Sequence, residues 1–342
     1  MTFGFHAANV AALSSQLDRT IEETSFSGVV QVAHAGRILY ARAAGFAERA
    51  QRVPNTLDTQ FAIASGTKAL TALALMSLIA EGRLALDTEV HGVLGQQHEL
   101  VARAVTVRQL LAHTSGMGDY LDESAITDIE DYMLEVPVER LACPADFVPL
   151  LAGRPTQFLP GTKFAYCNSG YVLLALLIEV VSGRSYYDVV QERVCAPAGM
   201  QATSFLRLDE LPGSAAIGYL PKRGWRSNHL HVPVRGAGDG GAYSTAGDVA
   251  RLWTALFAGR IVPSALVQEM IRPQHDSGPA ARRYGLGFWL TSARAAVQLE
   301  GSDAGISFRS SFEPTTGLLY SVLSNTTSGA WPVVRQLEAL LL

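Results

Sequence analysis

Apolar residues recur at helical spacing in several stretches of the chain, and one stretch is apolar on almost every face. Residues 8–23 predict an amphipathic surface helix, whose apolar positions lie three or four apart: Val10, Leu13, Leu17 and Ile21. Residues 69–81 are apolar nearly all round and are followed by Gly82. Helices without a polar face are buried in the interior of a protein. We therefore expect a central, buried helix that begins at about Ser65 and ends at Gly82.

Strands are predicted at both ends of the chain, and helices between them. Residues 28–34 and 36–45 should form a hairpin that turns at Ala35 and Gly36. Further strands are expected towards the C-terminus, at residues 284–290, 295–300, 306–312 and 318–324. The remaining helices are expected at residues 106–113, 170–181, 185–194, 244–257, 264–271 and 331–342.

This order of elements indicates an α+β fold, in which both termini contribute to one antiparallel sheet flanked by helices. Residues 1–63 and 240–342 would form the sheet domain, and residues 64–239 would form an inserted, mostly helical domain. We expect the functional site at the interface of these two domains.

Composition and charge narrow the classes of partner. The 48% hydrophobic and 17% charged residues are typical of an ordinary globular protein. A net charge of −4 without any basic block argues against nucleic acid or an anionic membrane surface as a partner. The longest apolar runs are also too short to cross a bilayer. We expect a small-molecule partner, and the sequence predicts nothing about the oligomeric state.

The cysteines and the N-terminus bear on the compartment. Cys143, Cys167 and Cys195 form an odd, widely spaced set, which favours free thiols in a reducing environment over a disulfide framework. The first residues lack the charged and apolar segments of a secretion signal. These features predict a cytoplasmic protein.

Ser65 and Lys68 are the first candidates for chemistry, because they lie three residues apart at the start of the buried helix. Side chains at that spacing share a helix face, so the amine can reach the hydroxyl. A helix N-terminus also favours negative charge at the serine oxygen. The pair predicts a nucleophilic serine. The alternative is that Ser65 only caps the helix and that Lys68 reaches out to solvent.

Tyr166 and Asn168 precede the second apolar helix and could complete this pair. A tyrosine beside an ammonium has its phenolate favoured, so Tyr166 could take the serine proton and later activate water. Asn168 could accept a hydrogen bond from Lys68 and donate one to a substrate carbonyl. The alternative for Tyr166 is a packing role alone.

Ser65-Gly-Thr-Lys68 and Tyr166-Cys-Asn168 resemble the first two motifs of the serine hydrolases with the class C β-lactamase fold, which include family VIII carboxylesterases, DD-peptidases and D-aminopeptidases. The similarity extends over about residues 28–325, because other recurring segments of that family follow in the same order: Leu110-Leu-Ala-His-Thr-Ser-Gly116, Pro160-Gly-Thr-Lys-Phe-Ala-Tyr166, Gly240-Gly-Ala-Tyr-Ser-Thr-Ala-Gly-Asp248 and Tyr284-Gly-Leu-Gly-Phe288. The resemblance implies a β-lactamase or transpeptidase-like fold. It also implies that Ser65 is the acylated nucleophile, Lys68 its amine partner and Tyr166 the base.

The third motif of that family departs from the pattern. Its Lys or His, small residue and Gly align with Leu299-Glu300-Gly301, so Gly301 matches but Leu299 replaces the cation. That cation would help to hold the carboxylate of a β-lactam or a D-Ala-D-Ala end, and Glu300 would repel the carboxylate if it faces the pocket. By the same resemblance, the backbone N–H groups of Ser65 and Ser302 form the oxyanion hole. Asn168, Gly301 and Ser302 are then the expected substrate-binding residues.

These features predict a serine hydrolase with an acyl-enzyme intermediate, and a carboxylesterase for small neutral esters is the first choice. A β-lactamase or a D-amino-acid peptidase or amidase is the second, and a ligand-binding or acylated sensor protein without turnover is the third. We expect no cofactor and no metal, because His229 and His231 alternate without a third ligand at metal-site spacing. The acidic run at residues 119–135 predicts a solvated face, or a rim of the pocket.

Overall fold

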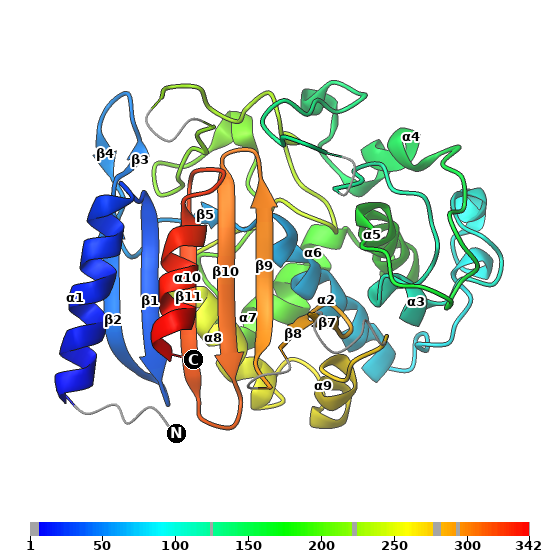
Figure 1. The fold of residues 1–342 in the computed structure, drawn as a ribbon. Helices are drawn as coiled ribbons and strands as arrows, with labels where there is room; N and C mark the ends of the chain where they lie inside the picture. The colour runs from blue at the N-terminus through cyan, green and yellow to red at the C-terminus, as the bar shows by residue number, and fades with distance from the viewer. Residues whose placement is uncertain (1–6, 124–125, 221–223, 276–281, 292–294, 342) are drawn as a thin grey trace.

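The computed structural model describes residues 7–123, 126–220, 224–275, 282–291 and 295–341. Its largest element is a seven-stranded antiparallel sheet in the order β2-β1-β11-β10-β9-β8-β7 (Figure 1). The strands are β1 (Gly28–His34), β2 (Arg37–Ala44), β7 (Arg283–Tyr284), β8 (Trp289–Leu290), β9 (Val297–Asp303), β10 (Ile306–Glu313) and β11 (Leu318–Ser324). Both ends of the chain build this sheet, which confirms the predicted α+β fold.

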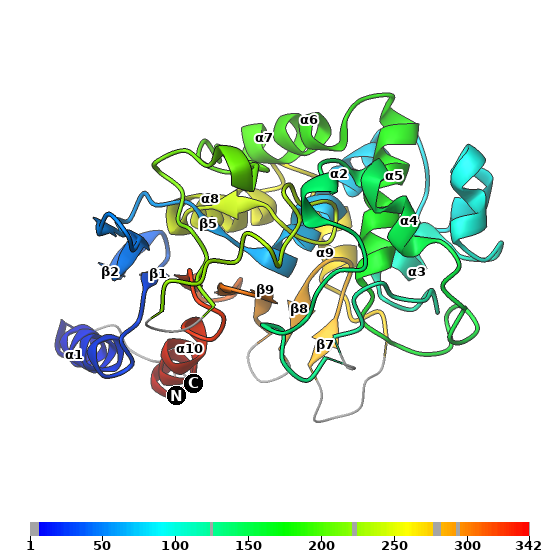
Figure 2. The ribbon, with the colours of Figure 1, turned by 90° about the horizontal axis from the view of Figure 1, so that it is seen from above.

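Helices cover both faces of the sheet. Figure 2 shows α1 (Ala7–Glu23) and α10 (Ala330–Leu341) on one side, and α2 (Thr67–Ala80) and α8 (Ala246–Phe257) on the other. Strand β1 is buried on both sides, because Val29 belongs to the core around α2 and α8 whereas Val30 packs with α1 and α10. The remaining helices are α3 (Val107–Leu111), α4 (Val148–Leu151), α5 (Asn168–Ser182), α6 (Tyr186–Val190), α7 (Ala196–Ala198) and α9 (Ser264–Met270).

Helix α2 lies at the centre of the molecule, as its all-round apolar sequence predicts. Every residue from Thr67 to Leu78 is buried. The α-helix begins two residues later than expected, because Ala64–Gly66 form a 3-10 turn in front of it. Ala64 has a φ of 41°, a left-handed conformation that is uncommon for a residue with a side chain. Ser65 is therefore held on a tight, strained turn rather than inside a regular helix.

Two short strands connect this turn to a distant part of the chain. β5 (Phe61–Ala62) pairs antiparallel with β6 (Tyr243–Ser244). The pairing brings the approach to Ser65 beside the glycine-rich residues 236–241. A separate ribbon of β3 (Phe46–Glu48) and β4 (Val53–Pro54) lies past the upper ends of β1 and β2 in the view of Figure 1.

The predicted single strand over residues 284–290 is wrong. The structure has two short strands there, β7 and β8, which pair with each other around a tight turn. Gly287 has a φ of 92°, which an extended strand does not accommodate. At Gly285 a Cβ would lie 2.1 Å from the carbonyl oxygen of Met270, so only glycine allows this close approach.

The other predicted helices and strands are present with end points shifted by a few residues. No helix in the described part of the chain combines the length and the apolar character that crossing a bilayer requires. Cys143, Cys167 and Cys195 are free thiols. The division into two domains at residues 64 and 239 stays a prediction, and so does the cytoplasmic location.

Candidate active site

The structure brings Ser65 and Lys68 together at the start of α2. The Nζ of Lys68 lies 3.0 Å from the Oγ of Ser65. Lys68 is only 1% exposed, so its charge needs partners inside the protein. The same Nζ donates to Asn168 Oδ1 at 2.7 Å and to the backbone oxygen of Asp239 at 2.8 Å. Three acceptors match the three N–H donors of an ammonium, which indicates a charged Lys68.

Asn168 holds its position as the first residue of α5. The carboxylate of Asp119 accepts hydrogen bonds from the backbone N–H of Asn168, at 2.9 Å, and of Ser169, at 2.8 Å. An acidic side chain at a helix N-terminus is favourable, because it satisfies free N–H groups and faces the positive end of the helix dipole. The Nδ2 of Asn168 donates to Leu121 O, at 2.9 Å, and to Glu123 Oε1, at 3.2 Å. These bonds direct the amide oxygen of Asn168 towards Lys68.

Tyr166 is a third neighbour of Ser65, and its phenol lies near the serine hydroxyl. Burial and the charge of Glu123 raise the pKa of the Tyr166 phenol well above its usual value, while the nearby Ser65 hydroxyl acts in the opposite direction. The sequence instead predicts a phenolate favoured by a neighbouring ammonium. The difference has a geometric reason: Lys68 Nζ lies over the aromatic ring of Tyr166, 4.8 Å from its centroid.

His113 supports the segment that carries Tyr166, and residue spacing along the sequence does not reveal this contact. Its ring lies 4.2 Å from the ring of Tyr166, centroid to centroid. Its Nδ1 accepts the backbone N–H of Cys167 at 3.0 Å, and its backbone oxygen accepts that of Ala165 at 2.9 Å. His113 thus binds the residues on both sides of Tyr166. Burial and Lys68 lower the pKa of His113 well below its usual value, so the ring stays neutral.

The third-motif segment lies on β9, which runs past the Ser65 turn. At Gly301 a Cβ would lie 2.0 Å from the oxygen of Ile63 and 2.9 Å from the nitrogen of Ser65. Glycine is required for this approach. Ser302 follows at the wall of the cavity and is exposed. The backbone of the segment 301–302 therefore lies beside the backbone of Ser65, where the sequence places the oxyanion hole.

Leu299 and Glu300 both point away from the cavity. Leu299 is 3% exposed and belongs to the main hydrophobic core. Glu300 binds Arg282 at 2.6 Å and also pairs with Arg309, which in turn reaches Glu338 on α10. Glu300 therefore does not face the cavity, and among the described residues that line it no arginine or lysine replaces the cation that the family motif provides.

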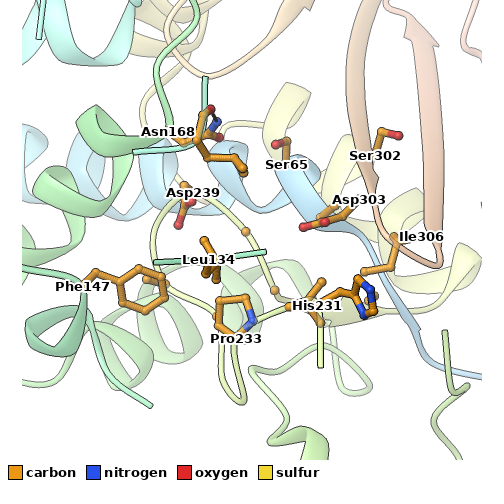
Figure 3. Close-up of a pocket in the computed structure, with 18 of the residues that line it drawn as sticks. Ser65, Leu134, Phe147, Asn168, His231, Pro233, Asp239, Ser302, Asp303 and Ile306 are labelled. Atoms are coloured by element: carbon orange, nitrogen blue, oxygen red, sulfur yellow. Dashed lines mark hydrogen bonds between the residues drawn. The ribbon is translucent and has the colours of Figure 1, made fainter. Parts of the chain in front are cut away.

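A cavity opens in front of Ser65 and holds about 790 Å³ of space, its open mouth included (Figure 3). Its polar wall contains Asn168, Ser302 and the carboxylates of Glu123, Asp239 and Asp303. Its apolar wall comes from five separate stretches of the chain, through the side chains of Leu121, Tyr132, Leu134, Phe147, Leu206, Leu208, Val232 and Ile306. The acidic run at residues 119–135 thus contributes to the cavity as well as to the surface.

The carboxylates are perturbed by their surroundings. Burial raises the pKa of Asp239, whose side chain accepts a hydrogen bond from Tyr120 Oη at 2.5 Å. Burial, together with the charges of Glu123 and Asp239, raises the pKa of Asp303 to about 7. Burial also raises the pKa of Glu123. Within the described residues, no group of His, Cys, Asp and Glu has a metal-binding arrangement.

Comparisons with known proteins identify the family to which the chain is similar. The family model described as Beta-lactamase matches residues 15–342. Esterase EstB of Burkholderia gladioli is 31% identical over 332 residues, which cover 85% of this chain and 81% of the esterase. Penicillin-binding protein 4* of Bacillus subtilis (strain 168) is 30% identical, with 80% of this chain and 61% of that protein covered. The chain therefore spans less than two thirds of the latter relative.

A solved structure supports the fold independently. The penicillin-binding protein from Bacillus halodurans superposes with a TM-score of 0.89 at 36% sequence identity. The superposition covers 95% of this chain and 99% of that one. The similarity therefore includes the sheet, the helices and the segments around the cavity.

Proposed function

Because the chain belongs to the beta-lactamase family and is a serine hydrolase, we propose that it is a carboxylesterase that cleaves small esters through an acyl-enzyme intermediate. One observation carries the proposal: Ser65 Oγ lies 3.0 Å from the Nζ of a buried lysine and opens onto a cavity. A buried ammonium beside a hydroxyl stabilises the alkoxide that forms when the serine attacks. The esterase among the relatives supports the choice of ester bonds.

In the proposed reaction, Ser65 Oγ attacks the carbonyl carbon of the ester and its proton passes to the phenolate form of Tyr166. The carbonyl π electrons move to oxygen, and the backbone N–H groups of Ser65 and Ser302 hold the oxyanion. Collapse of this intermediate expels the alcohol, which takes the proton from Tyr166. Water then gives a proton to Tyr166 and attacks the acyl carbon. When this second intermediate collapses, the bond from the acyl carbon to Ser65 Oγ breaks, Ser65 Oγ takes the proton back from Tyr166, and the acid leaves.

The lining of the cavity supports substrates without a carboxylate. Leu299 stands where the family motif has a cation, and it lies in the core. Three acidic side chains line the cavity instead. A β-lactam or a D-peptide end would bring a further negative charge close to these groups, which is unfavourable. Esters without a carboxylate avoid this repulsion.

Replacement of the nucleophile tests the proposal. We expect Ser65→Ala to lower kcat for p-nitrophenyl acetate and butyrate by about 10⁴-fold, because the acyl-enzyme can no longer form. Ser264→Ala is the matched control, since Ser264 is exposed at the start of α9 and lies outside the cavity lining. Release of p-nitrophenol measures both variants.

Three outcomes would count against the carboxylesterase. Equal ester hydrolysis by Ser65→Ala and wild type would remove Ser65 from the reaction. Faster turnover of nitrocefin or of D-alanyl peptides than of esters would favour the amide-cleaving alternative. A permanent adduct on Ser65 without released product would favour a sensor.

A further inference from the structure

Acidic side chains predominate over basic ones among the described residues that line the cavity in front of Ser65. Glu123, Asp239 and Asp303 line it, and neither arginine nor lysine is among its described lining residues. Lys68 lies behind Ser65, is 1% exposed and already donates to three acceptors. His231 adds no positive charge at neutral pH, because burial and Arg226 lower its pKa.

Asp303 is the carboxylate best placed to act on a substrate. It ends β9 directly after Ser302, and Figure 3 shows its side chain directed into the cavity that Ser65 also faces. It accepts a hydrogen bond from the backbone N–H of Ala304 at 2.7 Å. No salt bridge between Asp303 and a basic side chain is present in the described parts of the chain.

A nearby acid on the same strand shows the contrast. Glu300 lies three residues earlier on β9, and its carboxylate is paired with both Arg282 and Arg309. Among the described residues, the acid that faces away from the cavity is therefore neutralised, whereas the acid that faces into it has no basic partner. An unpaired carboxylate in a partly dehydrated cavity is unfavourable by itself and becomes favourable when a cation binds.

Further acidic side chains lie outside the cavity, next to its wall. A neighbouring groove shares Tyr120 and Tyr132 with the cavity wall and is lined by the further acids Asp119, Asp122, Asp128, Asp131 and Glu135. Among the described residues of that lining, Arg154 is the one basic side chain, and it pairs with Glu135. A cavity and an adjoining groove lined by charges of one sign raise the local concentration of ligands with the opposite charge.

We propose that Asp303 is a specificity-determining residue that makes the enzyme prefer esters whose acyl group carries an ammonium. The inference rests on the proposed function, since the cavity is the place where Ser65 would meet its ester. The carboxylate of Asp303 binds the ammonium by a charge-assisted hydrogen bond. The preference acts mainly on KM, because the ammonium is bound both before and during the attack on the carbonyl carbon.

Three p-nitrophenyl esters of similar size test the preference: 3-aminopropionate, butyrate and the monoester of succinate. They carry an ammonium, no charge and a carboxylate, respectively. For wild type we expect kcat/KM to be about tenfold higher for the ammonium ester than for butyrate, and lower for the succinate ester than for both. Asp303→Asn should reduce the ratio of kcat/KM for the ammonium ester to kcat/KM for butyrate by about fivefold, chiefly through KM.

Two controls separate a specific effect from a general one. Asp209→Asn removes one exposed carboxylate, outside the cavity lining, that pairs with Arg207, and it should leave the ratio unchanged. Asp303→Glu keeps the charge and should retain the preference. Added salt should lower the wild-type ratio, and this measurement needs no variant.

The ratio is taken within each protein, so a loss of overall activity in a variant does not affect it. A ratio that stays the same in Asp303→Asn, or a wild-type ratio of one that is insensitive to salt, would overturn the inference while the carboxylesterase stands. Failure of wild type to cleave any of the three esters would instead refute the proposed function.

Discussion

At the residue scale, Ser65 has two neighbours that could take its proton, and their surroundings make them unequal. Lys68 donates to three acceptors, which leaves its amine no lone pair to accept a proton. Tyr166 lies near Ser65, but burial and Glu123 raise the pKa of its phenol well above the usual value. In the proposed mechanism Lys68 therefore supplies charge, and the phenolate of Tyr166 supplies the base.

This assignment predicts the pH dependence of the reaction. Because the pKa of Tyr166 is raised, the phenolate is a minor species at neutral pH, and its fraction grows about tenfold for each pH unit below that pKa. We expect kcat/KM for p-nitrophenyl butyrate to keep rising between pH 7 and pH 9, after subtraction of spontaneous hydrolysis. In Tyr166→Phe, kcat/KM for this ester should be about 10³-fold lower than in wild type and should show no such rise. A wild-type rate that is already constant above pH 7 would assign the base to another group.

Several residues of the candidate site could be predicted from the sequence, and others could not. Ser65, Lys68, Tyr166 and Asn168 are recognisable because the motifs that contain them resemble those of a known family, whereas residue type and spacing alone leave other roles open. The hydrogen bond from Lys68 to the backbone oxygen of Asp239 could not be predicted, because every residue type has a backbone oxygen. The contact of His113 with Tyr166 joins residues more than fifty apart, so only the fold reveals it.

At the element scale, the close passage of β9 beside the Ser65 turn positions the expected oxyanion hole. Gly301→Ala would place a Cβ 2.0 Å from the oxygen of Ile63 and 2.9 Å from the nitrogen of Ser65, so the strand must move. We expect kcat to fall by about 10²-fold with a smaller change in KM, because displaced N–H groups stabilise the oxyanion less. Overpacking should also lower the free energy of unfolding by about 1–3 kcal/mol.

Gly213→Ala is the matched control for that variant. A Cβ at Gly213 meets nothing within 4 Å, and its backbone does not have a positive φ. This variant should keep the wild-type kcat and melting temperature. Wild-type kcat in Gly301→Ala would show that the backbone of β9 does not hold the oxyanion.

Elements whose apolar residues repeat at regular spacing were predicted well, whereas close approaches between elements were not. Helix α2 and the hairpin of β1 and β2 follow directly from periodicity. The strand predicted over residues 284–290 failed, because alternation alone does not distinguish a strand from two short strands around a glycine turn. The role of Gly301 depends on the contact between β9 and the Ser65 turn, which only the three-dimensional structure reveals.

At the scale of the whole molecule, the fold was predictable and the charge of the cavity was not. Strands at both ends and helices between them already indicate a sheet shared by the two termini, and the sheet order confirms it. Glu123, Asp239 and Asp303 lie on three separate segments, and the fold alone brings them to one cavity. A net charge of −4 for the chain gives no hint of this concentration.

The central claim is that Ser65 is the residue that is acylated, and direct labelling tests it. A p-nitrophenyl alkylphosphonate transfers its phosphonyl group to an activated serine and is not released by water. Peptide mass spectrometry of the treated chain should find one phosphonyl group, on the peptide that contains Ser65, in step with the loss of ester hydrolysis. Complete loss of activity with the label on any other residue would contradict the account.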